Sequence, residues 1–238
     1  MELAAPLVVI LAGGAGTRIR HLLPDVPKPL APVAGRPFLE WVIRYLRGQG
    51  LDSIVISAGF LADRIEAFAA EHSVACVKEP VALGTGGGFL HALAASRHEE
   101  RDVLACNGDS LVLTDLRPLL QALQDTTVDA ALLGVRVADA SRYGTLKLDA
   151  DDLLLGFAEK RPGAGLVNGG VYLFRRVLIG RFPVESPLSF EYDVFPSLIA
   201  SGARIVTVPC EAPFLDIGTE ESLARADAFI RNNVRWFA

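Results

Sequence analysis

The chain is poor in cysteine and has no apolar run long enough to cross a bilayer. Its 238 residues include three cysteines, Cys76, Cys106 and Cys210, which are widely separated within apolar segments. Three cysteines without the spacing of a metal site or a disulfide framework indicate small core residues in a reducing compartment. We therefore expect a cytoplasmic protein. No apolar stretch approaches the ~20 residues of a transmembrane helix, which argues against a membrane partner.

Positive charge is also in short supply. The formal net charge is −5, from 23 Lys and Arg against 28 Asp and Glu, which argues against a nucleic-acid partner. A local exception is the basic cluster Arg18, Arg20, Lys28 and Arg36. This cluster is either ordinary solvated surface charge or part of a site for a small anionic substrate.

Two common nucleotide-binding motifs are absent. There is no Gly-Lys-Ser/Thr, so the chain has no Walker P-loop. The dinucleotide fingerprint also fails, because Ile19 stands where its third glycine would be and the strand predicted over 53–57 ends at Ser57 without an acidic ribose ligand. We find no internal repeat, low-complexity tract or linker, and with 51% apolar residues we expect a single domain over 1–238.

A glycine-rich loop follows the first predicted strand, residues 7–12. Its sequence is Leu11-Ala12-Gly13-Gly14-Ala15-Gly16-Thr17-Arg18. Glycines allow backbone N–H groups to approach a ligand closely, and the threonine and arginine add a hydroxyl and a permanent positive charge. The combination predicts a loop that cradles phosphate.

Strand and helix patterns alternate through the first half of the chain. Strands are predicted over 7–12, 53–57, 74–78, 103–106 and 129–136, and helices from Phe38 to a stop at Gly48 and Gly50, over 61–71, over 86–96 and over 115–124. This alternation is typical of parallel strands covered by helices. We therefore predict an α/β fold, a Rossmann-like, mostly parallel mixed sheet with helices on both faces.

The second half is richer in strands. A hairpin is predicted from 143–149 and 152–158, and a strand over 166–174 whose Gly169-Gly170 pair indicates a bulge or a close ligand approach. A helix near 191–200, a strand over 204–208 and a helix over 219–234 complete the chain. Trp236-Phe237 at the end would either anchor a homo-oligomer or pack on the chain's own body.

Polar motifs lie where a ligand of a parallel sheet is expected. Asn107-Gly108-Asp109 directly follows a buried strand, and its carboxylate is placed to hold Mg²⁺, although the tripeptide could also be a simple turn. Lys28 lies between two prolines, so its stem leaves a stiff segment, as suits a charge that meets phosphate. The glycines after Leu83 open a helix whose first amides could face a polar ligand.

In their order along the chain, these motifs resemble the signature of the nucleoside-triphosphate sugar-1-phosphate nucleotidyltransferases. The matching segments are Leu11–Arg18, Pro27-Lys28-Pro29-Leu30, Leu83-Gly84-Thr85-Gly86-Gly87, Asn107-Gly108-Asp109, Tyr143-Gly144, Glu159-Lys160, Asn168-Gly169-Gly170 and Asp216-Ile217-Gly218. The resemblance covers essentially the whole chain. It implies a nucleotide-binding half over 1–136 and a sugar-binding half over 137–238.

The resemblance also implies a role for each motif. Asp109 and Asp216 would hold Mg²⁺, Arg18 would stabilise the leaving pyrophosphate, Lys28 would bind the transferred phosphoryl group and Lys160 the sugar phosphate. The nucleotide would contact Leu11, Ala12, Gly13, Gly14, Gly16, Thr17, Glu79, Gly84, Thr85, Asn107 and Gly108. The sugar would lie against Tyr143, Gly144, Glu159, Asn168 and Gly169.

Within this family the chain resembles the D-glycero-α-D-manno-heptose 1-phosphate guanylyltransferases. The segments behind this are Arg142–Thr145, Glu159-Lys160, Gly165–Tyr172 and Leu188–Glu191. GTP and a heptose 1-phosphate would then be the substrates, pyrophosphate would leave, and the sugar nucleotide would serve surface polysaccharide synthesis. One departure is that Val81-Ala82 separate Glu79-Pro80 from Leu83, so Glu79 either reads the base or is a solvated charge at a strand end.

Two alternatives remain open from the sequence. The first keeps the reaction and changes the substrates, giving a uridylyltransferase that acts on glucose or N-acetylmuramate 1-phosphate. The second is a regulatory domain that senses sugar nucleotides without catalysis. Because such domains tend to lose the metal carboxylates or the lysine-bearing loops, the presence of Asp109, Asp216, Lys28 and Lys160 favours an enzyme.

Overall fold

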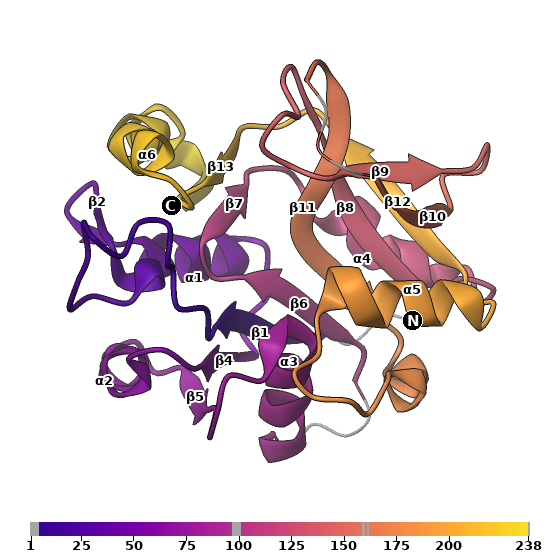
Figure 1. Ribbon diagram of the computed structural model, residues 1–238, viewed down its shortest axis with the longest axis horizontal. Coiled ribbons are helices and arrows are strands. Elements are labelled where there is room, and N and C mark those ends of the chain that lie inside the picture. The colour runs from indigo at the N-terminus through magenta and orange to yellow at the C-terminus, as the bar shows by residue number, and fades with distance from the viewer. Residues whose placement is uncertain (1–4, 97–100, 159, 161, 238) are drawn as a thin grey trace.

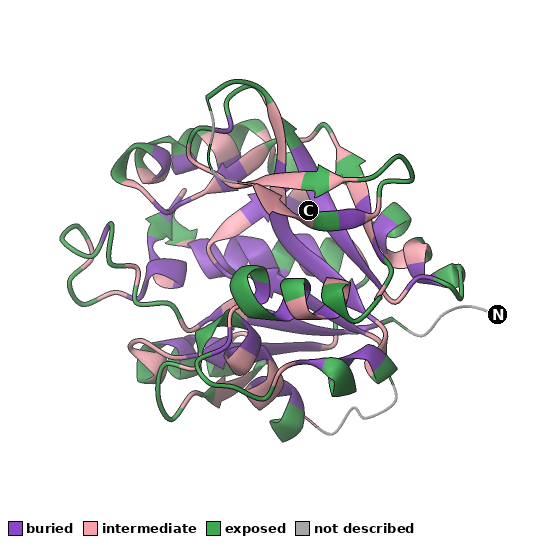
Figure 2. Cartoon of the chain, turned by 45° about the vertical axis from the view of Figure 1, so that its right-hand side comes forward, coloured by how far each residue is buried: buried purple, intermediate pink, exposed green. Residues whose placement is uncertain are grey.

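The computed structural model describes residues 5–96, 101–158, 160 and 162–237. Its centre is one mixed sheet that runs through the molecule between layers of helices (Figure 1). The strands at the centre of the sheet are buried, whereas strands near its two ends are partly exposed, as are the outer faces of the helices (Figure 2). No helix in these ranges is long and apolar enough to span a bilayer.

The first half supplies four parallel strands in the order β6-β1-β4-β5. Its larger elements are β1 (Leu7–Ala12), α1 (Phe38–Gly48), β4 (Ile54–Ala58), α2 (Ala62–Glu71), β5 (Ala75–Lys78), α3 (Gly84–Ala95), β6 (Val103–Asn107) and α4 (Arg117–Gln121). The shorter ones are β2 (Pro32–Val33), β3 (Arg36–Pro37) and β7 (Ser110–Val112). Parallel strands of this kind end at one edge of the sheet, and β1 and β6 end at the glycine-rich loop and at Asn107.

The second half extends this sheet mainly through antiparallel pairs, although its last strand in the sheet, 205–210, pairs parallel with the strand over 130–137. Its elements are β8 (Ala130–Val137), β9 (Thr145–Leu148), β10 (Leu154–Ala158), β11 (Gly165–Phe174), α5 (Phe195–Ala200), β12 (Ile205–Cys210), β13 (Phe214–Asp216) and α6 (Glu220–Asn232). The long strand β11 joins the halves, because it pairs with β6 on one side and with β8 and β9 on the other. Strand β13 leaves the main sheet and pairs with β7.

Two apolar cores lie on opposite faces of the sheet. On one face, Val8 and Ile10 of β1 belong to the same apolar cluster as the buried side of α1, which includes Phe38 and Tyr45. On the other face, Val9 contacts α3 and an aromatic cluster made of Phe89, Tyr172, Phe174, Phe182, Phe190 and Phe195. Alternating side chains of one strand thus supply both cores, as expected for a central strand.

The structure confirms the predicted fold class and places each predicted strand and helix within a few residues of its expected bounds. The hairpin forms as β9 and β10, and the register of β11 shifts between Asn168 and Tyr172, where Gly170 has φ of +70°. The expected helix over 115–124 is α-helical only to Gln121 and ends in a 3-10 turn, and the helix near 191–200 begins with a π turn over Phe190–Val194.

The chain's last residues pack on its own body. The Trp41 and Phe237 rings lie 5.1 Å apart at their centroids, and Tyr45 and Trp236 lie 6.2 Å apart. Phe237 is 5% exposed. Of the two sequence-based alternatives for Trp236-Phe237, the structure therefore shows intramolecular packing against α1.

Candidate active site

Three neighbouring cavities form a continuous cleft across the carboxyl ends of β1 and β6. The Glu79 cavity has a volume of about 570 Å³, the Lys28 cavity about 180 Å³ and the Tyr143 cavity about 510 Å³, each named after one residue that lines it. Leu11, Gly14 and Asp109 line both of the first two, and Arg18 lines both of the last two. The Lys28 cavity therefore connects two larger chambers.

All of the predicted nucleotide residues except Gly108 line the first two cavities, together with three predicted catalytic residues, Arg18, Lys28 and Asp109. Leu11, Ala12, Gly14, Gly16, Thr17, Arg18, Lys28 and Asp109 line the Lys28 cavity, and Gly13, Glu79, Gly84, Thr85 and Asn107 line the Glu79 cavity. Gly108 lines neither, but its N–H donates to the Leu11 carbonyl over 2.9 Å and so ties the end of β6 to β1. The residues predicted from the sequence thus lie together along two connected cavities of the cleft.

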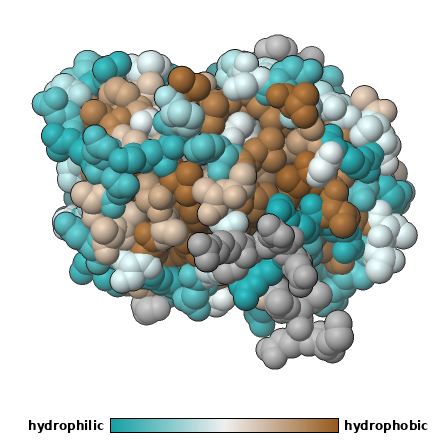
Figure 3. Space-filling view, turned by 90° about the horizontal axis from the view of Figure 1, so that it is seen from below, coloured by the Kyte–Doolittle hydropathy of each residue, from teal (hydrophilic) through white to brown (hydrophobic). Residues whose placement is uncertain are grey.

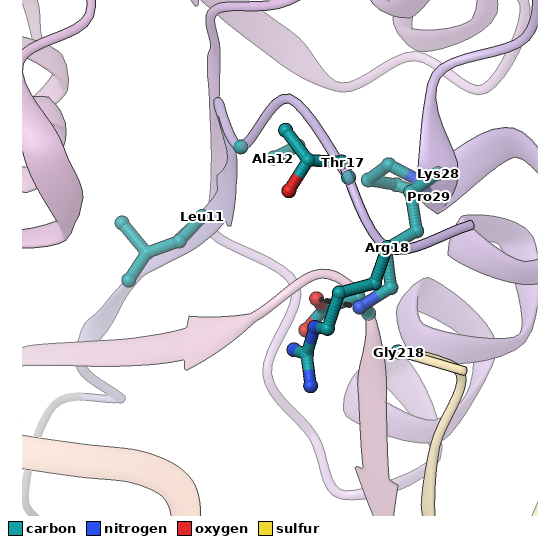
Figure 4. Close-up of a pocket in the computed structure, with 10 residues that line it drawn as sticks. Leu11, Ala12, Thr17, Arg18, Lys28, Pro29 and Gly218 are labelled. Atoms are coloured by element: carbon teal, nitrogen blue, oxygen red, sulfur yellow. Dashed lines mark hydrogen bonds and ion pairs between the residues drawn. The ribbon is translucent and has the colours of Figure 1, made fainter. Parts of the chain in front are cut away.

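The glycine-rich loop turns back over Lys28. Gly16 adopts φ of +58°, and a Cβ there would lie 3.1 Å from the Lys28 Cβ, so the position favours glycine on both counts. In Figure 4 the Thr17 hydroxyl and the Arg18 side chain point into the cavity, with Lys28 beside them and Gly218 at its far side. Positive charges from two turns of the chain therefore face one small chamber.

Lys28 lies between two carboxylates. Its Nζ is 2.5 Å from Oδ2 of Asp109 and 3.6 Å from Oδ1 of Asp216. The lysine is 8% exposed, and the two aspartate side chains are 34% and 23% exposed. A partly buried group of this kind interacts more strongly than a surface pair, because less water screens it. The ammonium thus offsets part of the negative charge of the two aspartates.

The two carboxylates meet because β7 and β13 pair. Asp216 stands opposite Ser110 in this ladder, and the Ile217 N–H donates to the Asp109 carbonyl over 3.0 Å. The Gly218 N–H in turn donates to Asp216 Oδ1 over 2.5 Å, which fixes the carboxylate. Neither short strand was predicted, so the sequence indicated both aspartates but not the ladder that joins them.

The donor set suits Mg²⁺. Carboxylate oxygens are ligands that Mg²⁺ prefers, and this ion is commonly held by one or two carboxylates with substrate phosphates and water completing the shell. Among the residues that the structure describes, no group of three or more His, Cys, Asp and Glu side chains could hold a metal. Asp109 and Asp216 would hold the ion at one point, and phosphate oxygens would have to supply further ligands.

Glu79 is a fixed part of its cavity wall. Its carboxylate accepts hydrogen bonds from Ser57 Oγ at 3.0 Å and from the Leu83 N–H at 3.2 Å. A Cβ on Gly13 or Gly88 would overlap this carboxylate, so the two glycines make room for it. The loop that carries Val81 and Ala82 therefore folds back onto Glu79 instead of carrying it into solvent. The sequence analysis did not assign Ser57 to the site. The clue was a single hydroxyl side chain in an otherwise apolar, buried strand.

The N-terminus of α3 is occupied by the chain itself. The Gly86 and Gly87 N–H groups donate to the Leu188 carbonyl, at 2.8 and 3.2 Å. Thr85 Oγ1 accepts from the Phe190 N–H at 3.0 Å. The expectation that the first amides of this helix face a polar ligand is therefore wrong for these two glycines, because a distant loop uses them. Gly84 and Thr85 still line the Glu79 cavity.

The Tyr143 cavity gathers most of the predicted sugar residues. Tyr143, Gly144, Lys160 and Asn168 line it, together with Asp216. Burial, and then the negative charge of Asp216, raise the pKa of Tyr143. Gly169 does not line it and is buried against the Leu133 carbonyl of β8, where a Cβ would lie 2.8 Å away. Glu159 lies outside the described residues.

The structure adds cavity residues that the sequence analysis did not assign. These are Arg142, Lys147, Phe157, Glu191, Tyr192 and Pro196. Asn168 Nδ2 donates to Glu191 Oε1 at 2.7 Å and to the Tyr172 hydroxyl at 2.8 Å, so three side chains form one network beneath the cavity. Burial, and then the charge of Glu191, raise the pKa of Tyr172, which keeps its hydroxyl protonated. Arg142 could have been assigned to the cavity from the sequence, because it directly precedes the predicted sugar residue Tyr143.

The chain belongs to the nucleotidyl transferase family, whose model matches residues 7–233. The fold, the order of the motifs and the cleft agree with this assignment, and the protein is a nucleotidyltransferase. The alternative of a regulatory domain without catalysis loses its support, because Lys28, Asp109 and Asp216 are all present and lie together in the cleft.

Several relatives whose names state an activity are similar to this chain. The chain is 33% identical to the mannose-1-phosphate guanylyltransferase of Mycobacterium tuberculosis over 92% of its length, and it spans 63% of that protein. It is 32% identical to the D-glycero-α-D-manno-heptose 1-phosphate guanylyltransferase of Campylobacter jejuni, covering 90% of this chain and 95% of that one. The crystal structure of HddC from Yersinia pseudotuberculosis complexed with GMP-PN superimposes with a TM-score of 0.82 at 32% identity, over 93% and 97% of the two chains.

Proposed function

We propose that the protein transfers a guanylyl group from GTP to a sugar 1-phosphate, most specifically D-glycero-α-D-manno-heptose 1-phosphate. The observation that carries this is the Lys28–Asp109–Asp216 group, which lies at the junction of two large cavities. A nucleoside in the Glu79 cavity and a sugar in the Tyr143 cavity would bring their phosphates together there. The name of the Campylobacter relative supports the choice of base and sugar, and the GMP-PN bound in the Yersinia structure supports the choice of base.

The proposed reaction is an in-line displacement at phosphorus. A phosphate oxygen of the sugar 1-phosphate forms a bond to the α-phosphorus of GTP, the bond from that phosphorus to the bridging oxygen breaks, and pyrophosphate leaves with the electron pair. Positioning and charge neutralisation account for most catalysis of this kind. Lys28 would neutralise the transferred phosphoryl group, Arg18 the leaving pyrophosphate, and Lys160 the acceptor phosphate. A Mg²⁺ ion held by Asp109 and Asp216 would supply further positive charge at the phosphates.

Pyrophosphate release over a panel of substrates tests this proposal directly. We expect the highest kcat/KM with GTP and D-glycero-α-D-manno-heptose 1-phosphate, with mannose, glucose and N-acetylmuramate 1-phosphates as competing acceptors and UTP as the competing nucleotide. A preference for UTP with glucose 1-phosphate would replace the guanylyl proposal by the uridylyl alternative. Failure of every sugar 1-phosphate to release pyrophosphate would overturn the acceptor class.

Glu79→Gln is expected to lower the preference for GTP over UTP. Guanine presents N1–H and the N2 amine side by side, and a carboxylate can accept both, whereas the carbonyls of uracil would be repelled. The change keeps the shape of the side chain but replaces one acceptor oxygen by an NH₂ group. We expect a loss of roughly 1–3 kcal/mol of discrimination, about 5- to 150-fold. Competition between the two triphosphates measures it.

Ser57→Ala is the matched control for this prediction. It removes a hydrogen bond to the Glu79 carboxylate without changing its charge. We expect a smaller loss of preference, because Leu83 still donates to the other carboxylate oxygen. If Glu79→Gln leaves the ratio of GTP to UTP unchanged, Glu79 does not read the base.

A further inference from the structure

Arg142 is held in the Tyr143 cavity by two contacts. Its Nη2 donates to Thr219 Oγ1 over 2.9 Å, and its guanidinium lies 5.7 Å from the centroid of the Tyr143 ring. Thr219 is the N-cap of α6 and follows Asp216 by three positions. The guanidinium is thus fastened to the segment that joins β13, which ends at Asp216, to α6.

Arg142 has no carboxylate partner in the described part of the chain, where its interactions are with Thr219 and Tyr143. The cavity carries four cationic side chains, Arg18, Arg142, Lys147 and Lys160, against the carboxylates of Glu191 and Asp216. Both carboxylates already accept hydrogen bonds, Glu191 from Asn168 and Asp216 from the Gly218 N–H. The excess of positive charge favours an anionic ligand.

The phosphate end of this ligand is expected beside Arg18 and Arg142, which line the same cavity. Arg18 lines both this cavity and the Lys28 cavity. Arg142, Arg225 and Arg18 all lower the pKa of the Tyr143 hydroxyl, against the larger opposing effects of burial and Asp216. Of these three arginines, Arg18 and Arg142 line the cavity, together with Asp216.

We propose that Arg142 is a second ligand of the acceptor phosphate and that Thr219 positions it for this role. The proposal rests on the proposed function. A guanidinium has five N–H donors in a rigid fork, and the bond to Thr219 uses one of them, which leaves others free for two phosphate oxygens. Because Thr219 already holds the Arg142 guanidinium in place, binding the phosphate costs less conformational entropy. The held guanidinium would also orient the phosphate toward the Lys28 group.

Arg142→Gln tests the proposal by steady-state kinetics with each substrate varied, using GTP and D-glycero-α-D-manno-heptose 1-phosphate or the best pair from the panel. We expect KM for the sugar 1-phosphate to rise about 10- to 100-fold, as for loss of a charge-assisted hydrogen bond, with KM for the triphosphate nearly unchanged. Arg142→Lys should recover only part of the affinity. A rise in KM for the triphosphate alone, or no change in either KM, would overturn the role.

Arg225→Gln is the matched control. Arg225 also acts on the Tyr143 hydroxyl, but it pairs with Glu221 at 3.5 Å and is not among the cavity's lining residues. We expect both KM values of this variant to stay at the wild-type level. An equal rise in KM for the acceptor in Arg225→Gln would show that general positive charge acts there, without a specific contact by Arg142.

Two variants of Thr219 test the positioning role. Thr219→Ser keeps the hydroxyl that accepts hydrogen bonds from Arg142 and from the Ser222 N–H. Its KM for the acceptor should therefore match that of the wild type. Thr219→Val removes it and should raise KM for the acceptor severalfold while kcat changes less. If Thr219→Val lowers only the melting temperature, the residue is a helix cap and nothing more. Because the wild type is measured with the same acceptors, failure of the proposed function is seen separately, as absence of turnover.

Discussion

Asp109→Asn and Asp216→Asn are each expected to lower kcat about 100- to 1,000-fold. Each change keeps the size of the side chain and removes a negative charge from the group around Lys28 Nζ. With one carboxylate gone, the proposed Mg²⁺ would lose a ligand, and the phosphates would lose the positive charge that it would supply. The measurement is pyrophosphate release at saturating substrates over a series of Mg²⁺ concentrations.

The double variant should be far less than additive, because both residues act through one ion. Asp151→Asn, in the exposed turn between β9 and β10, makes the same chemical change away from the cleft and should leave kcat unchanged. A rate near that of the wild type for either single aspartate variant would remove the metal assignment.

Lys28→Met is expected to lower kcat about 100-fold or more with a smaller change in either KM. The substitution keeps most of the side chain's length and apolar contacts and removes the charge. Asp109 and Asp216 would then lack the ammonium that now lies between them. The transferred phosphoryl group would lose the cation proposed to neutralise it. Steady-state kinetics with each substrate varied separates the effect on kcat from the effects on binding.

Lys28→Ala provides the comparison that isolates the charge. The Lys28 stem packs beneath Gly16, so alanine removes this support as well as the ammonium. We expect Lys28→Ala to be the worse of the two in thermal unfolding but similar in kcat. If Lys28→Met keeps most of the wild-type kcat, the lysine serves to hold the loop and does not act on the phosphoryl group.

The fold was largely predictable because its main elements have strong patterns. Strand β1 is an unbroken apolar run, and α1 shows apolar residues at helical spacing, all of which are buried. The strands that escaped prediction have two or three residues, namely β2, β3, β7 and β13, and so few residues cannot display a period of two. Their pairing depends on partners distant in sequence, which no local pattern reveals.

The site was predictable as a set of motifs but not as a geometry. Glycines and charged residues at strand ends marked the cleft, and resemblance supplied Asp216. The position of Lys28 between two aspartates depends on the pairing of β7 with β13, so it became visible only in the structure. The Leu188 carbonyl at α3 and the Thr219 hydroxyl at Arg142 were unpredictable for the same reason, because each contact joins distant parts of the chain.

The β7–β13 ladder has a consequence for the order of events during synthesis. Lys28 and Asp109, which are 81 residues apart, are both made before any of the second half leaves the ribosome. Asp216 arrives only with β13, and contacts between segments so far apart form slowly. A nascent chain that has folded its four parallel strands would thus lack Asp216, one of the two carboxylates around Lys28. Catalytic competence would be acquired late, in the step that docks the last strand and helix.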